Sequence, residues 1–182
     1  MDVIVVGGGH AGVEAALACA RNGFETLLCS IRTDMIASMP CNPSIGGPAK
    51  GIVVREIDAL GGQMGITADK TALQVKMLNT TKGPGVQSLR VQSDKIAYKQ
   101  MMQDVCLAQE HLTVLEGIVE TVLAENGKVK GIRMQDGTEY MAKCVVLTTG
   151  TYMASTCMIS DEVTPSGPDG QTTTGGISES LR

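Results

Sequence analysis

Three glycines near the start of the chain have the spacing of a phosphate-binding loop. An apolar run at 3–6 leads into Gly7, Gly9 and Gly12, spaced G-x-G-x-x-G, and an alanine-rich segment follows at once. The first glycine permits a tight turn, the second lets the backbone approach a pyrophosphate, and the third lets helix and strand pack closely. The N-terminus of the helix then faces the negative charge of the pyrophosphate. The candidate dinucleotide-binding residues here are Gly7, Gly8, Gly9, His10, Ala11 and Gly12.

The residue that ends the second predicted strand, 25–29, is unusual for such a site. In dinucleotide folds an acidic side chain at this place holds the ribose, about 20 residues beyond the glycines. Here Ser30 takes that place, and Asp34 follows four residues later. A serine hydroxyl can still bond ribose, so Ser30 is a candidate cofactor contact. The missing charge disfavours NAD more than FAD, whose contacts are spread over more of the chain.

Two further segments lie where a ligand could be held. Residues 39–51 carry Cys41 among glycines and prolines, a composition that predicts a loop without regular structure. A strand predicted at 144–147 runs into Thr149 and Gly150 at its carboxyl end, where open α/β sheets bind their ligands. Thr149 and Gly150 are therefore candidate cofactor contacts.

The elements needed to position these residues follow from the hydrophobic periodicity. Helices are predicted at 13–22, at 52–60 with 52, 53, 57 and 60 on one face, and at 89–109 with Ala97, Met101, Val105 and Ala108 as the buried stripe. A strand is predicted at 71–78, with Leu73, Val75 and Met77 alternately buried.

From residue 112 onward the period changes to that of strands, with turn signals at Asn126-Gly127 and Asp136-Gly137. The fold class is thus α/β: a Rossmann-like domain with a parallel sheet and a small β-meander. We assign 1–151 to this dinucleotide-binding domain. We assign 152–182, which is rich in Ser, Thr, Pro and Gly, to the irregular start of an inserted or second domain.

The composition excludes several classes of protein. A net charge of −4 carries no global basic signal for nucleic acid, and 2% aromatic residues provide no base-stacking platform. Neither a transmembrane helix nor a signal peptide is predicted. The six cysteines form no C-x-x-C pair, which predicts a reducing, cytoplasmic location and no metal site. Cys19, Cys29 and Cys144 fall in apolar patterns and are predicted to be buried thiols.

Five motifs together resemble the GidA/MnmG family, flavoproteins that modify the wobble uridine of tRNA. They are G-G-G-H-A-G at 7–12, C-N-P-S-I-G-G at 41–47, E-I-D-A-L-G-G at 56–62, K-G-P at 82–84 and L-T-T-G-T at 147–151. The resemblance implies a FAD-binding domain of the glutathione-reductase type, with the FAD pyrophosphate on residues 7–12, an adenine contact from the Val119 backbone and a further FAD contact at Thr174. Family members are much longer, so the chain corresponds to their N-terminal part.

The resemblance also implies the reaction and its participants. The full-length enzyme works in the cytoplasm, as a homodimer with a GTPase partner of the MnmE type, and takes a carbon from methylene-tetrahydrofolate. NADH reduces FAD, and a carboxymethylaminomethyl group is added at C5 of the tRNA uridine. The acidic balance places the tRNA surface mainly in other parts of the enzyme.

Cys41 is the candidate catalytic residue, because a thiolate could add to C6 of the uracil and thereby activate C5. The alternative is that Cys41 shapes its loop through backbone contacts. Two other functions also stay open. The chain could belong to another FAD enzyme, such as a folate-dependent tRNA uracil methyltransferase or a small-molecule oxidoreductase, or it could be a non-catalytic nucleotide-binding module.

Overall fold

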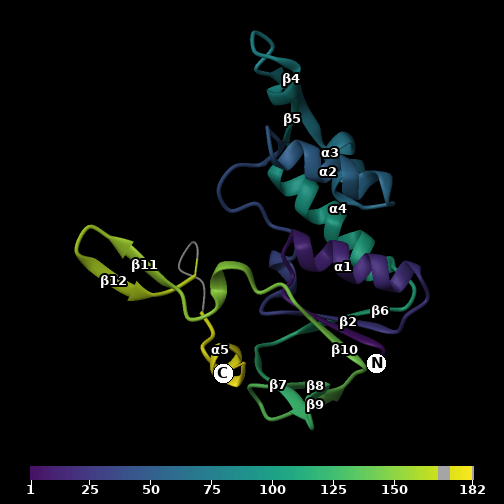
Figure 1. Ribbon diagram of the computed structural model, residues 1–182, viewed down its shortest axis with the longest axis vertical. Helices are drawn as coiled ribbons and strands as arrows, with labels where there is room; N and C mark the ends of the chain where they lie inside the picture. The colour runs from purple at the N-terminus through teal and green to yellow at the C-terminus, as the bar shows by residue number, and fades with distance from the viewer. Residues whose placement is uncertain (168–172, 182) are drawn as a thin grey trace. The chain divides into compact units, whose positions relative to one another are not determined.

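The chain forms two compact units. The computed structural model of the protein describes residues 1–167 and 173–181 (Figure 1). The first unit combines Met1–Ile36 with Gln109–Arg182, and the second is the intervening segment Ala37–Ala108. Every predicted cofactor contact therefore lies in the first unit.

A four-stranded parallel sheet is the centre of the first unit. Its strand order is β10-β1-β2-β6. β1 and β2 are buried along their whole length, as expected for parallel strands that are covered on both faces. The elements of this unit are β1 (Val3–Val6), α1 (His10–Arg21), β2 (Thr26–Ser30), η1 (Thr33–Met35), β6 (Leu112–Glu116), β7 (Val119–Glu125), β8 (Lys128–Met134), β9 (Glu139–Met141), β10 (Cys144–Leu147), η3 (Gly150–Tyr152), β11 (Thr156–Ile159), β12 (Glu162–Pro165) and α5 (Gly176–Ser180).

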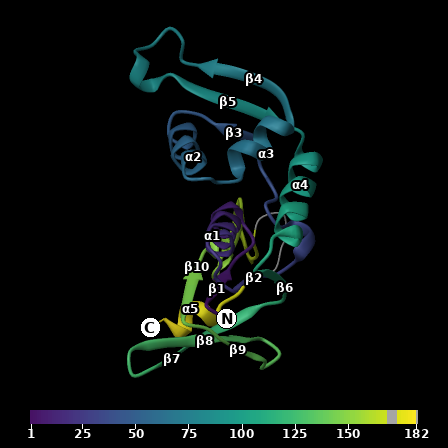
Figure 2. The ribbon, with the colours of Figure 1, turned by 90° about the vertical axis from the view of Figure 1, so that its right-hand side faces the viewer.

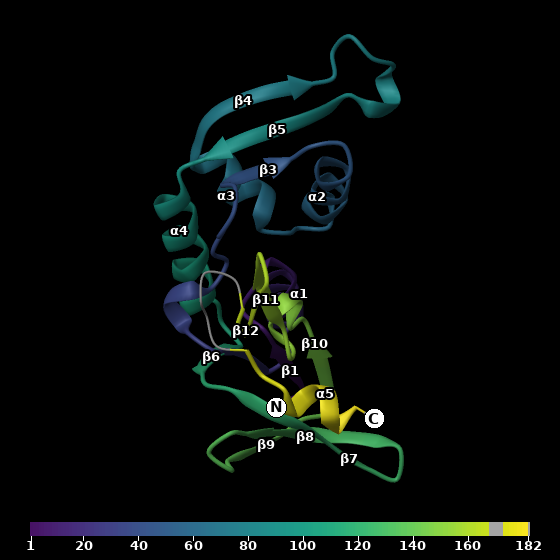
Figure 3. The same cartoon turned by 90° about the vertical axis from the view of Figure 1, so that its left-hand side faces the viewer.

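Two layers cover opposite faces of this sheet, as Figures 1 and 3 show. α1 packs on β1 and β2 and buries Val13 and Leu17. The antiparallel sheet β7-β8-β9 covers the other face, where Ile4 and Leu27 share a buried cluster with Ile132 of β8. The predicted parallel sheet and β-meander are therefore confirmed.

The turns of this meander lie where the sequence predicts them. Asn126 and Gly127 join β7 to β8 with φ values of 51° and 71°, as a two-residue hairpin turn requires. Gly137, with φ 87°, lies in the turn between β8 and β9.

The segment after residue 151 contains more regular structure than expected. β11 and β12 form an antiparallel pair, and the backbone of Met153 bridges to Thr174. The expectation of an irregular segment is wrong here, because backbone pairing across the short turn between the strands does not require an apolar pattern. Of this segment, 168–172 and 182 lie outside the described residues. The proposed domain boundary near residue 151 stays a prediction.

The second unit is a three-stranded antiparallel sheet with helices (Figure 2). The predicted loop at 39–51 contains the short strand β3, which pairs with β5. The predicted helix 89–109 is a strand followed by a helix, since Asp94 accepts hydrogen bonds from the N–H groups of Ile96 and Ala97 and so begins the helix there. The elements are β3 (Ser44–Gly46), α2 (Lys50–Ala59), α3 (Met64–Lys70), β4 (Ala72–Leu78), η2 (Pro84–Val86), β5 (Ser88–Ser93) and α4 (Lys95–Ala108).

Burial in the second unit differs from the expected pattern. α4 buries Tyr98, Met102 and Cys106, one position beyond three members of the predicted stripe. In β4, an edge strand, Leu73 is 70% exposed and Val75 is 56% exposed. Apolar periodicity therefore identified these elements but not the sides that they bury. The same holds for α2, in which Val54 is the one buried residue.

The three cysteines expected to be buried have different environments. Cys29 is 1% exposed in β2, and burial raises the pKa of its thiol to about 12. Cys19 is half-buried, and Cys144 is exposed. The expectation for Cys144 is wrong because it begins β10, the edge strand of the parallel sheet.

Among the described residues, every helix is too short or too polar to cross a membrane.

An ion pair at the start of the sheet predicts how stability depends on pH. His111 Nδ1 lies 2.7 Å from Glu25 Oε1, and this carboxylate raises the pKa of His111. A raised pKa in the folded state stabilises the protein below the ordinary pKa of about 6.5 and loses that effect as pH rises through the raised pKa. Asparagine tolerates the left-handed φ of 62° at this position. We therefore expect His111→Asn to reduce the loss of unfolding free energy between about pH 6.5, the ordinary pKa of histidine, and the raised pKa of His111. Urea denaturation at several pH values measures this; equal slopes in both proteins would contradict it.

Candidate dinucleotide-binding site

The glycine loop joins β1 to an uncapped helix N-terminus. Gly7 has a φ of 116°, and its N–H donates to the Cys29 carbonyl at 2.8 Å. Gly9 is the N-cap of α1, and no side chain caps the helix and no acidic residue lies in its first turn. The first N–H groups of a helix have no partner within the helix, and the helix dipole is positive at this end. This end of α1 therefore suits an anion such as a pyrophosphate.

The three fingerprint glycines have different roles in this loop. A Cβ on Gly12 would clash with the Gly7 carbonyl oxygen and lie 2.6 Å from Thr148 Oγ1. A Cβ on Gly7 would clash with the Thr148 carbonyl oxygen. A Cβ on Gly9 would meet no atom within 4 Å. Gly7 and Gly12 thus allow close packing inside the protein, whereas Gly9 is exposed and leaves room for a ligand beside the backbone.

Thr148 links this loop to the neighbouring strand by hydrogen bonds, a role that was not predicted from the sequence. Its N–H donates to the Val6 carbonyl at 2.9 Å, and its hydroxyl lies 3.0 Å from that oxygen and 3.1 Å from the Gly7 carbonyl. The predicted contacts Thr149 and Gly150 come directly after it and begin η3. A threonine at the carboxyl end of the strand next to β1 was the signal that could have identified this role.

Ser30 supports the loop from the other side. The residue is 7% exposed, and its hydroxyl donates to the Arg32 carbonyl at 2.8 Å. A Cβ on Gly8 would lie 2.6 Å from Ser30 Oγ, so the two residues are in close contact. Ser30 therefore shapes the turn after β2, and its contact with a ribose stays a prediction.

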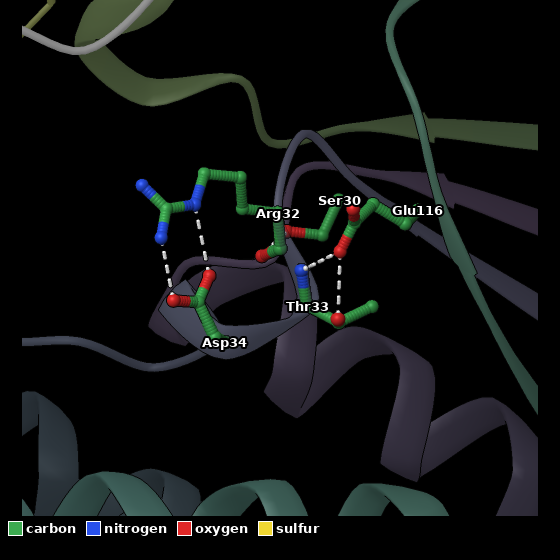
Figure 4. A network of polar contacts seen from close by, with 5 residues as sticks. All are labelled: Ser30, Arg32, Thr33, Asp34 and Glu116. Atoms are coloured by element: carbon green, nitrogen blue, oxygen red, sulfur yellow. Dashed lines mark hydrogen bonds and ion pairs between the residues drawn. The ribbon is translucent and has the colours of Figure 1, made fainter.

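Acidic and basic side chains surround the end of β2 (Figure 4). Glu116, at the end of β6, pairs in register with Ser30. Its carboxylate accepts hydrogen bonds from the Thr33 N–H at 2.8 Å and the Thr33 hydroxyl at 2.7 Å, which lower its pKa. Arg32 and Asp34 form an ion pair of 2.6 Å beside it. β2 itself ends without a carboxylate. The two carboxylates near its end belong to Glu116 of the adjacent strand β6 and to Asp34 of the loop that follows β2.

The other predicted contacts lie in separate elements of the same unit. Val119 begins β7, and the residue as a whole is 4% exposed in the core cluster. Thr174 is half-buried; its N–H donates to the Tyr152 carbonyl at 2.9 Å, which places it beside η3. Their roles toward a cofactor stay predictions.

Cys41 lies in the second unit and is exposed. The same unit contains a cavity of about 200 Å³ between α2, α3, β3 and β5, whose lining includes Arg55, Asp58 and Asp69 but not Cys41. The structure therefore places Cys41 on an accessible loop, and its catalytic role stays a prediction.

The chain is similar over its whole length to a known family. The family model described as glucose inhibited division protein A matches residues 2–182. The tRNA uridine 5-carboxymethylaminomethyl modification enzyme MnmG of Bacillus subtilis is 54% identical over 180 residues, which are 99% of this chain and 29% of that protein. The chain thus spans less than a third of the length of this curated relative.

Two solved structures show the same fold. GidA of Aquifex aeolicus matches with a TM-score of 0.95 and 50% identity, covering 100% of this chain and 30% of that one. A probable FAD-dependent monooxygenase of Pseudomonas aeruginosa matches with a TM-score of 0.53 and 15% identity, covering 80% and 41% of the two chains. These matches confirm the predicted fold class.

The packing of the loop predicts a contrast between two glycine substitutions. We expect Gly12→Ala to lower the unfolding free energy by about 1–3 kcal/mol, because the new methyl group meets backbone atoms of Gly7, which cannot move without shifting the end of β1. Gly9→Ala, whose methyl group would meet no atom, should change it by less than about 0.5 kcal/mol. Urea denaturation measures both, and equal effects would contradict the assigned roles.

Proposed function

The chain belongs to the family of glucose inhibited division protein A, and on that premise we propose that it is the FAD-binding part of an enzyme that modifies the wobble uridine of tRNA by adding a carboxymethylaminomethyl group at C5. The single observation that supports FAD binding most directly is the open Gly9 backbone at the uncapped N-terminus of α1. The curated relative described above is named as an enzyme of this reaction.

The residues present fit a dinucleotide with its pyrophosphate at α1. The backbone of Gly7–Gly12 would hold the pyrophosphate, and Ser30 and the Val119 backbone would bind the adenosine end. Thr149, Gly150 and Thr174, which lie close together around η3, would contact the rest of the cofactor. Bound FAD supplies the redox chemistry of the reaction. The task of these residues is to hold and orient it.

We propose Cys41 as the nucleophile toward the uracil ring. Its thiolate would add to C6, and the resulting enolate would form a bond from C5 to the incoming one-carbon unit. Loss of the C5 proton with elimination of the thiolate would then restore the C5–C6 double bond. Exposure of Cys41 is consistent with access for a substrate as large as tRNA.

Further participants belong to the full-length enzyme. We propose NADH as the reductant, methylene-tetrahydrofolate as the carbon donor, tRNA as the substrate and a GTPase of the MnmE type as the partner of a cytoplasmic homodimer. We also propose that residues 1–151 form a cofactor-binding domain and that 152–182 begin a second domain.

FAD binding tests the proposed site directly. We expect the purified chain to bind FAD, and Gly9→Ala to weaken the affinity by about tenfold or more, since the methyl group would occupy the space of a phosphate oxygen. Titration with flavin fluorescence gives both dissociation constants. Gly85→Ala is the matched control, because its methyl group also meets no atom but lies in the second unit. A chain that takes up no FAD would contradict the proposal.

The role of Cys41 requires the full-length enzyme. We expect Cys41→Ser to abolish tRNA modification and to leave bound FAD unchanged, because serine is a far weaker nucleophile than a thiolate. Mass spectrometry of the nucleosides measures modification, and the flavin absorption spectrum measures FAD. Cys144→Ser, at another exposed cysteine, should keep full activity. Unchanged turnover of Cys41→Ser would assign Cys41 to loop structure alone.

A further inference from the structure

The end of β2 carries a guanidinium that is already engaged. Arg32 lies two residues beyond β2. Its Nε donates to Asp34 Oδ1 at 2.9 Å and its Nη2 to Asp34 Oδ2 at 2.6 Å, so the contact is bidentate (Figure 4). Such a pair uses an edge of the guanidinium with which arginine also binds a phosphate or a carboxylate.

A second carboxylate, that of Glu116, gives the group of charged side chains at the end of β2 a net negative charge. Glu116 is fixed by the N–H and the hydroxyl of Thr33, and it is close enough to Arg32 and Asp34 to affect and be affected by their charges. One positive and two negative side chains leave a net charge of −1. The lowered pKa of Glu116 and the raised pKa of Arg32 keep these two side chains charged at neutral pH.

The place of these charges determines what they could recognise. In dinucleotide folds the ribose of the adenosine lies at the end of the second strand, where an acid bonds the 2′-hydroxyl and a nearby arginine accommodates a 2′-phosphate. Here the arginine is present, but the carboxylate of Asp34, four residues beyond Ser30, occupies the edge of the guanidinium that carries Nε and Nη2. Glu116 adds repulsion toward a further negative group.

We propose that Asp34, together with Glu116, makes this site select adenine nucleotides with a free 2′-hydroxyl and reject those with a 2′-phosphate. Asp34 does so by occupying Arg32, and Glu116 by setting a negative potential at the ribose. The inference rests on the proposed dinucleotide site and adds to it a specificity determinant. FAD, whose adenosine ribose carries no 2′-phosphate, is accepted, whereas NADP-type nucleotides are excluded.

The test measures preference between two nucleotides that differ only in the 2′-phosphate. The FAD-free chain is titrated calorimetrically with 5′-ADP and with 2′-phospho-5′-ADP. We expect Asp34→Asn, which keeps the side-chain shape, to improve the affinity for 2′-phospho-5′-ADP relative to 5′-ADP by about fivefold or more, since the freed guanidinium gains a phosphate partner. The gain should disappear in the double variant Arg32→Ala, Asp34→Asn.

A matched control separates this effect from a general change in charge. Glu139→Gln also removes a carboxylate from an exposed arginine, Arg133, which lies 3.0 Å away in the meander. It should leave the preference unchanged. An unchanged preference in Asp34→Asn, or a gain that survives loss of Arg32, overturns the inference while FAD binding still supports the proposed function. A chain that binds neither FAD nor 5′-ADP overturns the proposed site and this inference together.

Discussion

The close contact between the glycine turn and the strand beside it is the constraint on which the first unit depends. β1, α1 and β10 meet where Gly12 lies against the Gly7 carbonyl and Thr148 bonds to the carbonyls of Val6 and Gly7. Because side chains would prevent this approach, the helix N-terminus can come to the edge of the sheet only with glycine at these two places. The parallel sheet, its two covering layers and the open backbone at Gly9 all depend on that junction.

The proposed adenosine end of the site is surrounded by charged side chains. β2 ends in an uncharged serine, and the carboxylates come from the adjacent strand and the following loop. Glu116 is held by Thr33, and Asp34 is held by Arg32, so each acid has a defined partner. The proposed site would thus combine a pyrophosphate cradle of backbone N–H groups with a net negative ribose end.

The second unit shows the limit of periodicity as a guide to packing. α2, β4 and α4 were predicted, whereas β3, α3 and β5 were not. Even in the predicted β4, Leu73 and Val75 are exposed where alternate burial was expected. An alternating or helical pattern identifies an element and its two sides, whereas burial requires another element to cover one of them. β4 is an edge strand of a three-stranded sheet, and among the described residues that cover is lacking at these positions.

The sequence by itself determined the strand–glycine–helix unit, the meander with its turns and the absence of an acid at the end of β2, because each depends on neighbouring residues. Tertiary structure alone decided that Thr148 donates a hydrogen bond to Val6, which lies 142 positions earlier in the chain, and that Glu116 pairs in register with Ser30. It also decided which sides of α2, β4 and α4 are buried. These features depend on strand order and register, which bring together residues that no local pattern connects.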